Sequence, residues 1–216
     1  MAKTGRKGGG VGKSTNREDI RQRLITAAFE TLRDRGFAET SARAIAEAGG
    51  LNQAQIFYYF GSVNGLLVAA LERSSLEQLD AYRRTVGTAE TVSEIFVEVQ
   101  ARLEEDLASG HVKVLAELIG AGTADPELRT KVVELFTPWI ELTEQTVRQA
   151  VDRAGMSGLV PAEQVAYGAV CLFLGAQQLV TLTGDAKRVL EMFTAAQQTA
   201  TMLEAVLLPG LARERE

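Results

Sequence analysis

The sequence predicts an all-α protein, and three observations lead to that prediction. Long stretches of the 216-residue chain are rich in Ala, Leu, Glu, Gln and Arg, which favour helix, and only four prolines interrupt them. Apolar residues recur with the 3.6-residue period of an amphipathic helix, and no convincing period-2 alternation indicates a strand. Capping residues and glycines divide the chain into about nine helical segments. We expect a three-helix N-terminal domain joined by a long helix to a larger C-terminal helical bundle.

Start and stop signals place the first four helices over residues 17–35, 41–48, 52–60 and 62–86. Ser41 and Asn52 are N-cap residues of the two short helices, and Gln55 completes a capping box with Asn52. Residues 49–51, Gly-Gly-Leu, form the tight turn between them. Residues 1–16 are rich in Gly, Lys and Thr without an apolar period, so we expect a disordered arm there.

The same signals predict five further helices, over residues 91–107, 111–119, 126–154, 161–182 and 184–208. Thr91 and Glu94 form a second capping box, and Pro126 occupies a first helical position. Pro138 has no N–H to donate to the preceding turn. The helix over 126–154 should therefore be kinked or restarted at Pro138.

The composition is that of a globular protein, with 46% hydrophobic and 24% charged residues. Cys171 is the only cysteine, which excludes an internal disulfide and fits a reducing compartment. The longest apolar stretch, 165–176, is too short to cross a bilayer, and the basic start lacks the apolar run of a signal peptide. We therefore expect a soluble, cytoplasmic protein without a membrane partner.

The net charge of −5 is unevenly distributed. Residues 1–23 contain seven Lys and Arg against two acidic residues, a net charge of +5 that leaves −10 on the rest. A basic arm on an acidic body suits a protein that contacts phosphate at one end only. A solvated tail accounts for the same charges equally well.

The two short helices across a glycine turn, within residues 40–60, form the pattern of a helix-turn-helix. The second helix offers polar groups outward. Glutamine can pair two hydrogen bonds with an adenine edge, and tyrosine hydroxyls reach backbone phosphates. The four consecutive aromatics of residues 57–60 cannot all face one core, so at least two should be exposed for binding. Taken alone, two short helices are a weak indication of DNA binding.

Residues 20–71 closely resemble the N-terminal domain of the tetracycline-repressor family of transcriptional regulators. The matching features are Gly36-Phe37, Thr40-Ser41, Arg43, Ile45-Ala46, Ala48, Gly50-Leu51, the run from Ile56 to Phe60, Ser62 and Leu66-Leu67. The resemblance implies that residues 52–59 are the recognition helix. It also implies contacts to double-stranded DNA from Ser41, Arg43, Gln53, Ala54, Gln55, Phe57, Tyr58 and Tyr59. The expected parts are an arm over 1–16, a DNA-binding domain over 17–64 and a ligand-binding and dimerisation domain over 65–216.

Two positions depart from the family pattern. Val63 stands where the family often has lysine, which removes one phosphate contact. Gly49 stands where alanine is usual, which should loosen the end of the first short helix by about 1 kcal/mol. We expect the basic arm to supply the missing charge, since such arms enter the minor groove.

In the C-terminal part, the resemblance implies a cavity for a small-molecule effector. Aromatic walls with a few polar handles suit such a pocket, and the candidates are Phe96, His111, Leu115, Phe136, Trp139, Tyr167, Phe173 and Gln177. Each of them is also a plausible plain core residue, and His111 could be exposed at its helix start. The resemblance further implies a homodimer through the last two long helices, whose small residues are Gly168, Ala169, Gly175, Ala176, Ala195, Ala196 and Ala200. A dimer sets two recognition helices about 34–36 Å apart, which predicts an inverted-repeat operator.

Catalytic constellations are absent from the sequence, so we predict no enzyme, cofactor or metal. His111 is the only histidine, no Cys/His cluster has metal spacing, and the pair Glu104-Glu105 is typical of a solvated helix surface. The stretch KGGGVGKST over residues 7–15 is similar to a phosphate-binding loop. It has Lys7 where the motif needs glycine, and no strand precedes it.

The favoured interpretation is a ligand-responsive transcriptional regulator, a repressor that a small-molecule effector releases from DNA. The alternative is a ligand-independent DNA-binding protein, architectural or regulated by a partner, with a filled C-terminal core. A buried apolar cavity would distinguish the two.

Overall fold

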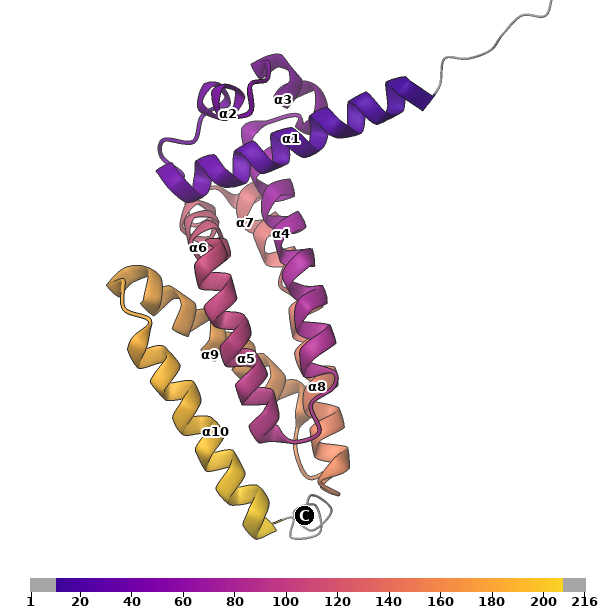
Figure 1. The fold of residues 1–216 in the computed structure, drawn as a ribbon, viewed down its shortest axis with the longest axis vertical. Helices are drawn as coiled ribbons and strands as arrows, with labels where there is room; N and C mark the ends of the chain where they lie inside the picture. The colour runs from indigo at the N-terminus through magenta and orange to yellow at the C-terminus, as the bar shows by residue number, and fades with distance from the viewer. Residues whose placement is uncertain (1–10, 208–216) are drawn as a thin grey trace, which may run out of the picture. The chain divides into compact units, whose positions relative to one another are not determined.

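The computed structural model describes residues 11–207, and the side chains of residues 16–206. These residues form ten α-helices and no strand, which confirms the predicted all-α class (Figure 1). The count exceeds the expected nine because the segment 126–154 is two helices, with a break before Pro138. The chain divides into two compact units, residues 1–71 and 72–216.

The first unit contains α1 (Val11–Arg35), α2 (Ala42–Gly49), α3 (Gln53–Phe60) and the start of α4 (Val63–Val86). Helix α1 begins six residues earlier than expected, so residues 11–16 of the expected disordered arm are helical, including half of the phosphate-loop-like stretch. Residues 1–10 of that arm lie outside the described residues. The core of the unit combines apolar side chains from all four helices, namely Leu24, Ala28, Leu32, Ile45, Ile56, Leu66 and Leu67.

The turn between α2 and α3 depends on two glycines with different tasks. Gly50 has a φ of +60°, the left-handed conformation that ends α2. Gly49 lies against α1, since a Cβ there would be 3.0 Å from Cβ of Ala27 and 3.2 Å from Cδ1 of Leu51. The glycine that sequence reasoning treated as a loosened helix end therefore permits the close approach of α2 to α1.

The second unit continues α4 and adds six helices: α5 (Val92–Ser109), α6 (His111–Gly122), α7 (Pro126–Glu134), α8 (Thr137–Arg153), α9 (Ala162–Thr183) and α10 (Lys187–Leu207). Helix α10 packs along α5, α8 packs along α9, and α6 contacts α5, α7 and α9 (Figure 1). The pairing of α10 with α5 joins segments that are far apart in the sequence, and so does that of α9 with α6.

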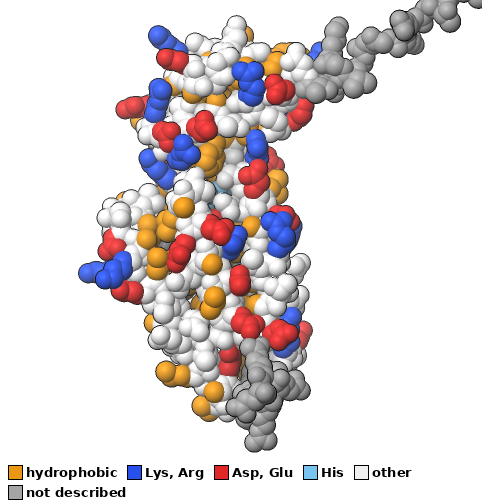
Figure 2. Space-filling model, in the orientation of Figure 1, with side chains coloured by type: hydrophobic (Ala, Val, Ile, Leu, Met, Phe, Trp, Pro, Cys, Tyr) orange, Lys and Arg blue, Asp and Glu red, His pale blue; other side chains and the backbone are white. Residues whose placement is uncertain are grey.

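Helix α9 is predominantly apolar and yet mostly exposed. An 18-residue window of it has a mean hydropathy of 1.6, and 22% of that window is buried. By length and composition α9 could cross a membrane. The expectation that the longest apolar stretch, 165–176, is too short to do so was therefore wrong. Figure 2 shows hydrophobic side chains on the left-hand side of the second unit, where Figure 1 places α10 and its junction with α9.

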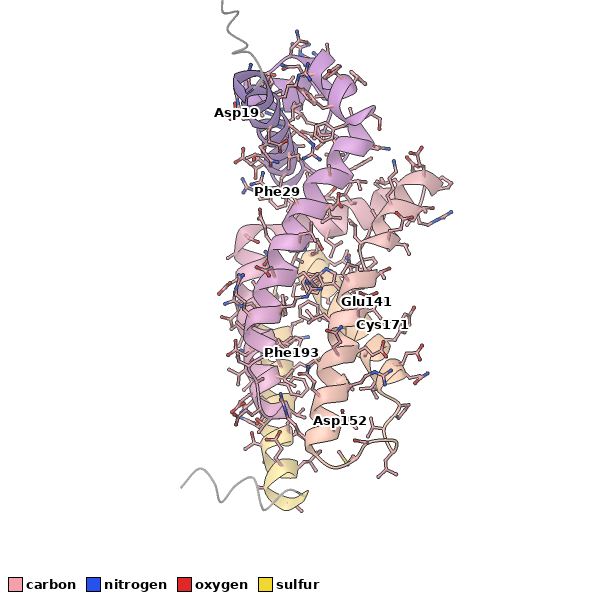
Figure 3. All side chains as sticks on the ribbon, turned by 90° about the vertical axis from the view of Figure 1, so that its right-hand side faces the viewer. Asp19, Phe29, Glu141, Asp152, Cys171 and Phe193 are labelled. Carbon is pink, nitrogen blue, oxygen red and sulfur yellow. The ribbon has the colours of Figure 1, made fainter. Side chains whose placement is uncertain are left out.

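The core of the second unit lies where α5, α6, α9 and α10 meet. Its buried cluster consists of Leu103, Val112, Ala176, Val180, Val189 and Phe193. Figure 3 labels Phe193 on α10, together with Cys171 on α9, which is exposed. Burial of these apolar side chains stabilises the unit by roughly 1.5–3 kcal/mol for each large residue.

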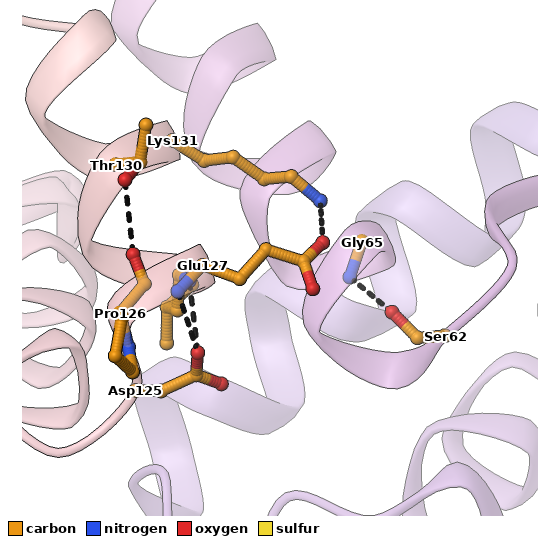
Figure 4. Close-up of polar contacts among 8 residues, drawn as sticks. Ser62, Gly65, Asp125, Pro126, Glu127, Thr130 and Lys131 are labelled. Carbon is orange, nitrogen blue, oxygen red and sulfur yellow. Dashed lines mark hydrogen bonds and ion pairs between the residues drawn. The ribbon is translucent and has the colours of Figure 1, made fainter.

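Helix termini in both units are closed by side chains. Asp125 Oδ1 accepts hydrogen bonds from the N–H groups of Glu127 and Leu128 at the start of α7, and Ser62 Oγ accepts one from Gly65 at the start of α4 (Figure 4). The predicted capping box of Thr91 and Glu94 opens α5. Proline in the first turn of α8 confirms the predicted restart at Pro138.

One cap joins distant parts of the second unit. The Glu204 carboxylate on α10 accepts hydrogen bonds from the Ser93 N–H at 2.9 Å and from the Ser93 hydroxyl at 2.7 Å. A carboxylate at a helix N-terminus also interacts favourably with the helix dipole. Glu204 therefore fixes the C-terminal part of α10 to the start of α5.

Candidate functional site

Helix α3 presents aromatic side chains to solvent. Phe57 is 53% exposed and Tyr58 is 71% exposed, while Tyr59 and Phe60 are half-buried. The ring of Tyr58 stands edge-on to Tyr59, with centroids 4.9 Å apart. The two exposed aromatics agree with the sequence argument that residues 57–60 cannot all be in the core.

The two glutamines of α3 differ in their freedom to contact a base. Gln53 is exposed and has no hydrogen-bond partner among the described residues. Gln55 Oε1 accepts a hydrogen bond from the Asn52 N–H at 3.0 Å, which completes the predicted capping box. A bidentate contact to adenine needs both the oxygen and the amide of the side chain. Gln53 therefore suits that contact, whereas Gln55 has only its amide available while the box is closed.

Three of the predicted DNA-contact residues border one groove of the first unit. The groove has a volume of about 960 Å³, and its walls are Asn16, Ile20, Arg23, Arg43, Ala46, Glu47, the turn 50–52, Gln53 and Gln55. Arg43 is exposed on α2, and Arg23 Nη2 donates to the Gly49 carbonyl at 3.1 Å. Ser41 and Ala54 are exposed as well, with Ser41 Oγ accepting from the Ala44 N–H as the cap of α2.

The predicted effector-pocket residues separate into two groups. His111, Leu115 and Gln177 are buried. Phe96, Phe136, Trp139 and Phe173 are half-buried. Tyr167 is 60% exposed, so this ring does not line the interior. The sequence pattern misplaced Tyr167 because α9 is apolar on its exposed face as well as on its buried one.

Tyr82 on α4 is the central ring of an interior aromatic group. Its centroid lies 5.1 Å from that of Trp139 and 6.1 Å from that of Phe173, both edge-on, and Phe173 lies 6.2 Å from Phe193. Trp139 Nε1 donates to the Ser75 hydroxyl at 2.8 Å. Sequence reasoning missed Tyr82, although its spacing of three residues from Leu79 places it on the inward face of α4.

Asp106 is the second residue that sequence reasoning missed. Its side chain is 1% exposed, and the Tyr82 hydroxyl donates to Oδ2 at 3.2 Å. Burial, opposed by the Tyr82 hydrogen bond and the Arg102 charge, raises the pKa of Asp106 to about 7. The residue follows the pair Glu104-Glu105, which is typical of a solvated surface, and the sequence analysis did not single it out. The helical period turns Asp106 inward, where it is buried like Leu103.

His111 is buried, which removes the exposed placement that the sequence left open. Its side chain is 4% exposed, and Nδ1 forms a hydrogen bond of 2.7 Å with the Ser74 hydroxyl on α4. Burial lowers the pKa of His111 to about 4. The imidazole is therefore neutral near pH 7, and it joins α6 to α4.

The exposed side of α9 combines large apolar residues with glycines. Leu172, Leu179 and Leu182 are all more than half exposed. A Cβ at Gly168 or Gly175 would have no heavy atom within 4 Å among its described surroundings. Packing within the chain therefore does not explain these glycines. Ala176 and Ala200, by contrast, are buried inside the unit and are unavailable to a partner.

Two family models match the chain. Residues 24–70 match the bacterial regulatory proteins of the tetR family, and residues 113–197 match the tetracyclin repressor-like C-terminal domain. The first match contains the whole of α2 and α3, and the second extends from α6 into α10.

Two curated relatives are HTH-type transcriptional regulators named BetI. The chain is 36% identical over 70 residues to the protein of Stenotrophomonas maltophilia, and 30% identical over 98 residues to that of Paraburkholderia xenovorans. The aligned regions cover 31% and 44% of this chain, and 36% and 50% of those relatives. The chain thus matches at most half the length of the curated relatives.

Solved structures share the fold at low sequence identity. A TetR-family transcriptional regulator from Rhodococcus sp. superposes with a TM-score of 0.71 at 17% identity, covering 85% of this chain and 98% of that one. A regulator from Saccharomonospora viridis in complex with choline gives 0.67 at 20% identity, covering 87% and 96%. FadR from Bacillus subtilis in complex with stearoyl-CoA gives 0.68 at 15% identity, covering 82% and 95%.

Proposed function

Because the chain belongs to the tetracycline-repressor family of bacterial regulatory proteins, we propose that it is a ligand-responsive transcriptional repressor. Proteins of this family are DNA-binding regulators and not enzymes. In this proposal the chain binds an inverted-repeat operator as a homodimer and leaves it when a small molecule binds. The observation that carries the proposal is the capped helix α3, with Gln53, Phe57 and Tyr58 exposed.

We assign recognition of the DNA sequence to the first unit. Gln53 contacts a base edge in the major groove, and Ala54 allows the N-terminus of α3 to approach closely enough to touch a thymine methyl. Ser41, Arg43, Tyr58 and Tyr59 contact phosphates, which position the protein without specifying sequence. Gln55 contributes through its amide, and Phe57 packs against the sugar-phosphate backbone. The basic residues at the N-terminus contribute charge that Val63 does not supply.

Dimerisation is assigned to α9 and α10 of the second unit. The exposed apolar residues of these helices include Leu172, Leu179, Leu182, Met202 and Val206, a surface that is costly to leave in water. Exposed glycines at 168 and 175 allow the backbone of a second chain to approach closely. Leu172→Glu should therefore shift the chain to monomers in sedimentation, whereas Leu76→Glu on α4, an equally exposed leucine, should not. A chain that instead partitions with membranes would assign α9 to a bilayer.

Effector binding is assigned to the interior of the second unit, beside Tyr82, Trp139 and Phe173. Unpaired buried polar atoms in this unit favour a ligand over a filled core, because such atoms cost free energy when nothing bonds them. Similar structures that hold choline and stearoyl-CoA support a small-molecule effector in general. The effector releases DNA when it binds more tightly to a dimer whose recognition helices no longer match the half-site spacing. A protein that acts on operator DNA is assigned to the cytoplasm.

The experiment that tests this proposal is selection of duplexes from a random pool by the full chain. The expected result is enrichment of one inverted repeat, with half-sites separated by about one helical turn or a multiple of it. Gln53→Ala should change the bases enriched at symmetric positions. Retention of duplexes without sequence enrichment would contradict the proposal and leave only nonspecific, salt-dependent DNA binding.

A further inference from the structure

Two buried acceptor atoms in the second unit have no hydrogen-bond donor among the described residues. They are Oδ1 of Asp106 and Oε1 of Gln177, on side chains that are 1% and 3% exposed. An unpaired buried acceptor costs about 1–3 kcal/mol, so such atoms are rare unless something else supplies a donor. Both acceptors need a donor, and the described part of the same unit also has two unpaired buried donors, Nε of Arg102 and Nε2 of Gln178.

The two acceptors lie beside the aromatic group around Tyr82. Asp106 contacts Tyr82 directly, through the hydrogen bond from the hydroxyl to Oδ2. Gln177 lies one helical turn after Phe173 on α9, and the Phe173 ring is 6.1 Å from that of Tyr82. Aromatic faces carry negative charge density and attract cations. Acceptor oxygens and aromatic rings together therefore favour a cation that carries N–H groups.

The local charges favour the same sign of ligand. Arg102, one turn before Asp106 on α5, donates through Nη2 to Glu105 Oε1 at 2.5 Å. Glu105 therefore shares the guanidinium, whose charge still lowers the pKa of Asp106 but does not outweigh the effect of burial. His111 adds no positive charge, because its burial keeps the imidazole neutral. An anionic effector would add a second negative charge beside a buried carboxylate that Arg102 offsets only in part, which is unfavourable.

We propose that the effector is a protonated organic amine with an apolar body, whose ammonium donates to Asp106 and Gln177 beside the rings of Tyr82 and Phe173. This inference rests on the proposed function, since it names the class of effector for the same unit. Trp139, edge-on to Tyr82 at 5.1 Å, contacts the apolar body. Asp106 supplies the charge that distinguishes an amine from an alcohol of the same shape.

The titration of Asp106 gives the proposal a second signature. The groups that act on its carboxyl are Tyr82 on α4 and Arg102 and Glu105 on α5, and burial raises the pKa to about 7. A cation binds the ionised form, so binding below pH 7 must first release the proton. The dissociation constant for an amine should rise about tenfold for each pH unit below 7 and level off above it.

The test is a fluorescence titration of the full chain, because Trp139 is its only tryptophan. The probes are phenethylamine, benzylamine and cyclohexylmethylamine, each matched with the uncharged alcohol of the same skeleton. At pH 8 the best amine should bind at least tenfold more tightly than its alcohol. Asp106→Asn should remove that preference, whereas Glu104→Gln, an exposed carboxyl two residues earlier on α5, should retain it.

Equal binding of amines and alcohols, or an amine preference that survives Asp106→Asn, would overturn the proposal. Saturable binding by none of the amines would overturn it as well. The pH profile of the unsubstituted chain gives an independent result, since an amine affinity that stays constant from pH 5 to 8 contradicts a role for Asp106. These titrations contain no DNA. If duplex selection succeeds and amines fail, only the effector class is wrong, whereas failure of selection refutes the regulator itself.

Discussion

The Tyr82 hydroxyl on α4 donates a hydrogen bond to Oδ2 of Asp106 on α5 across 3.2 Å, and both side chains are buried. Two further hydrogen bonds join α4 to other helices, one between Ser74 and His111 on α6 and one from Trp139 on α8 to Ser75. Helix α4 is therefore held to three different helices by hydrogen bonds in an otherwise apolar interior. Polar contacts of this kind fix the register of packed helices, because each atom has few alternative partners.

Tyr82→Phe should lower the free energy of unfolding by about 1–3 kcal/mol, because Asp106 then has two unpaired oxygens. Loss of the hydroxyl also raises the pKa of Asp106 further, since the Tyr82 hydrogen bond opposes the effect of burial. Chemical denaturation at pH 7 measures the change. Tyr167→Phe, at an exposed tyrosine, is the matched control and should leave the stability of the isolated chain unchanged. Equal effects of the two substitutions would show that the bond contributes nothing.

The free energy of unfolding of the Asp106→Asn variant should increase relative to that of the unsubstituted chain as pH rises. The folded pKa of Asp106 is about 7 against an ordinary value of 3.8, so its contribution is complete below pH 4 and is lost as pH rises towards 7. The difference between variant and parent should grow by about 1.4 kcal/mol per pH unit across this window and then level off. Denaturation curves from pH 4 to 8 give the difference, with Glu104→Gln as the charge-matched control. A difference independent of pH would contradict the buried carboxyl.

In the unsubstituted chain, the effects of Asp106 and His111 on the free energy of unfolding should nearly cancel between pH 4 and 6.5. His111 has a folded pKa of about 4 against an ordinary 6.5, so it contributes stability above pH 6.5 that is lost as pH falls towards 4. The change of stability with pH that His111 causes is therefore opposite in sign to the change that Asp106 causes. Removing Asp106 should therefore expose the His111 slope, with stability of the variant rising between pH 4 and 6.5. A variant whose stability falls with pH over that range would contradict the assignment.

Gly49→Ala should destabilise the first unit, although alanine favours a helix by about 1 kcal/mol over glycine. The new Cβ would lie 3.0 Å from Cβ of Ala27, an atom that cannot move without shifting α1. Thermal unfolding measures the change. In an Ala27→Gly background only the Leu51 side chain stays close, with Cδ1 at 3.2 Å, and its rotation can relieve that contact. The same substitution should then become neutral or stabilising. A stabilising effect of Gly49→Ala in the unsubstituted chain would show that the contact is not tight.

Sequence reasoning predicted the helices well where side chains act locally. The capping boxes of Asn52 with Gln55 and Thr91 with Glu94, and the restart at Pro138, depend on neighbours within four residues, and all three are present. The role of Gly49 was not predictable, because it depends on Ala27, which is distant in sequence. Helix propensity alone predicts that Gly49 destabilises the end of α2.

The candidate site in the second unit was predictable only in part. Trp139, Phe173 and Gln177 were identified from their residue types, whereas Tyr82 and Asp106 were not. Asp106 follows two solvated glutamates, and only the packing of α5 against α4 shows that it is buried beside Tyr82. Tyr167 was misassigned because α9 has large apolar residues, such as Leu172 and Leu179, on its exposed face as well.

Gln53→Ala and Gln55→Ala should differ in what they disturb. Gln53 is exposed without a partner among the described side chains, so its loss should relax base preference and leave stability unchanged. Gln55→Ala removes the hydrogen bond that Gln55 Oε1 accepts from the Asn52 N–H, so it should also cost about 0.5–1.5 kcal/mol of stability. Tyr58→Phe should weaken binding to all duplexes alike, since a phosphate contact carries no sequence information. Selection and thermal unfolding of the three variants provide the comparison, and a selective effect of Tyr58→Phe would reverse the roles assigned here.

The central claim is that two copies of α3 read two half-sites on one face of the duplex. The direct measurement is the dissociation constant of the full chain for the selected inverted repeat, compared with the same duplex carrying five extra base pairs between the half-sites. Half a helical turn rotates one half-site to the opposite face, so affinity should fall to the level of a single half-site. Equal affinity for the two duplexes would contradict a dimer that reads both half-sites.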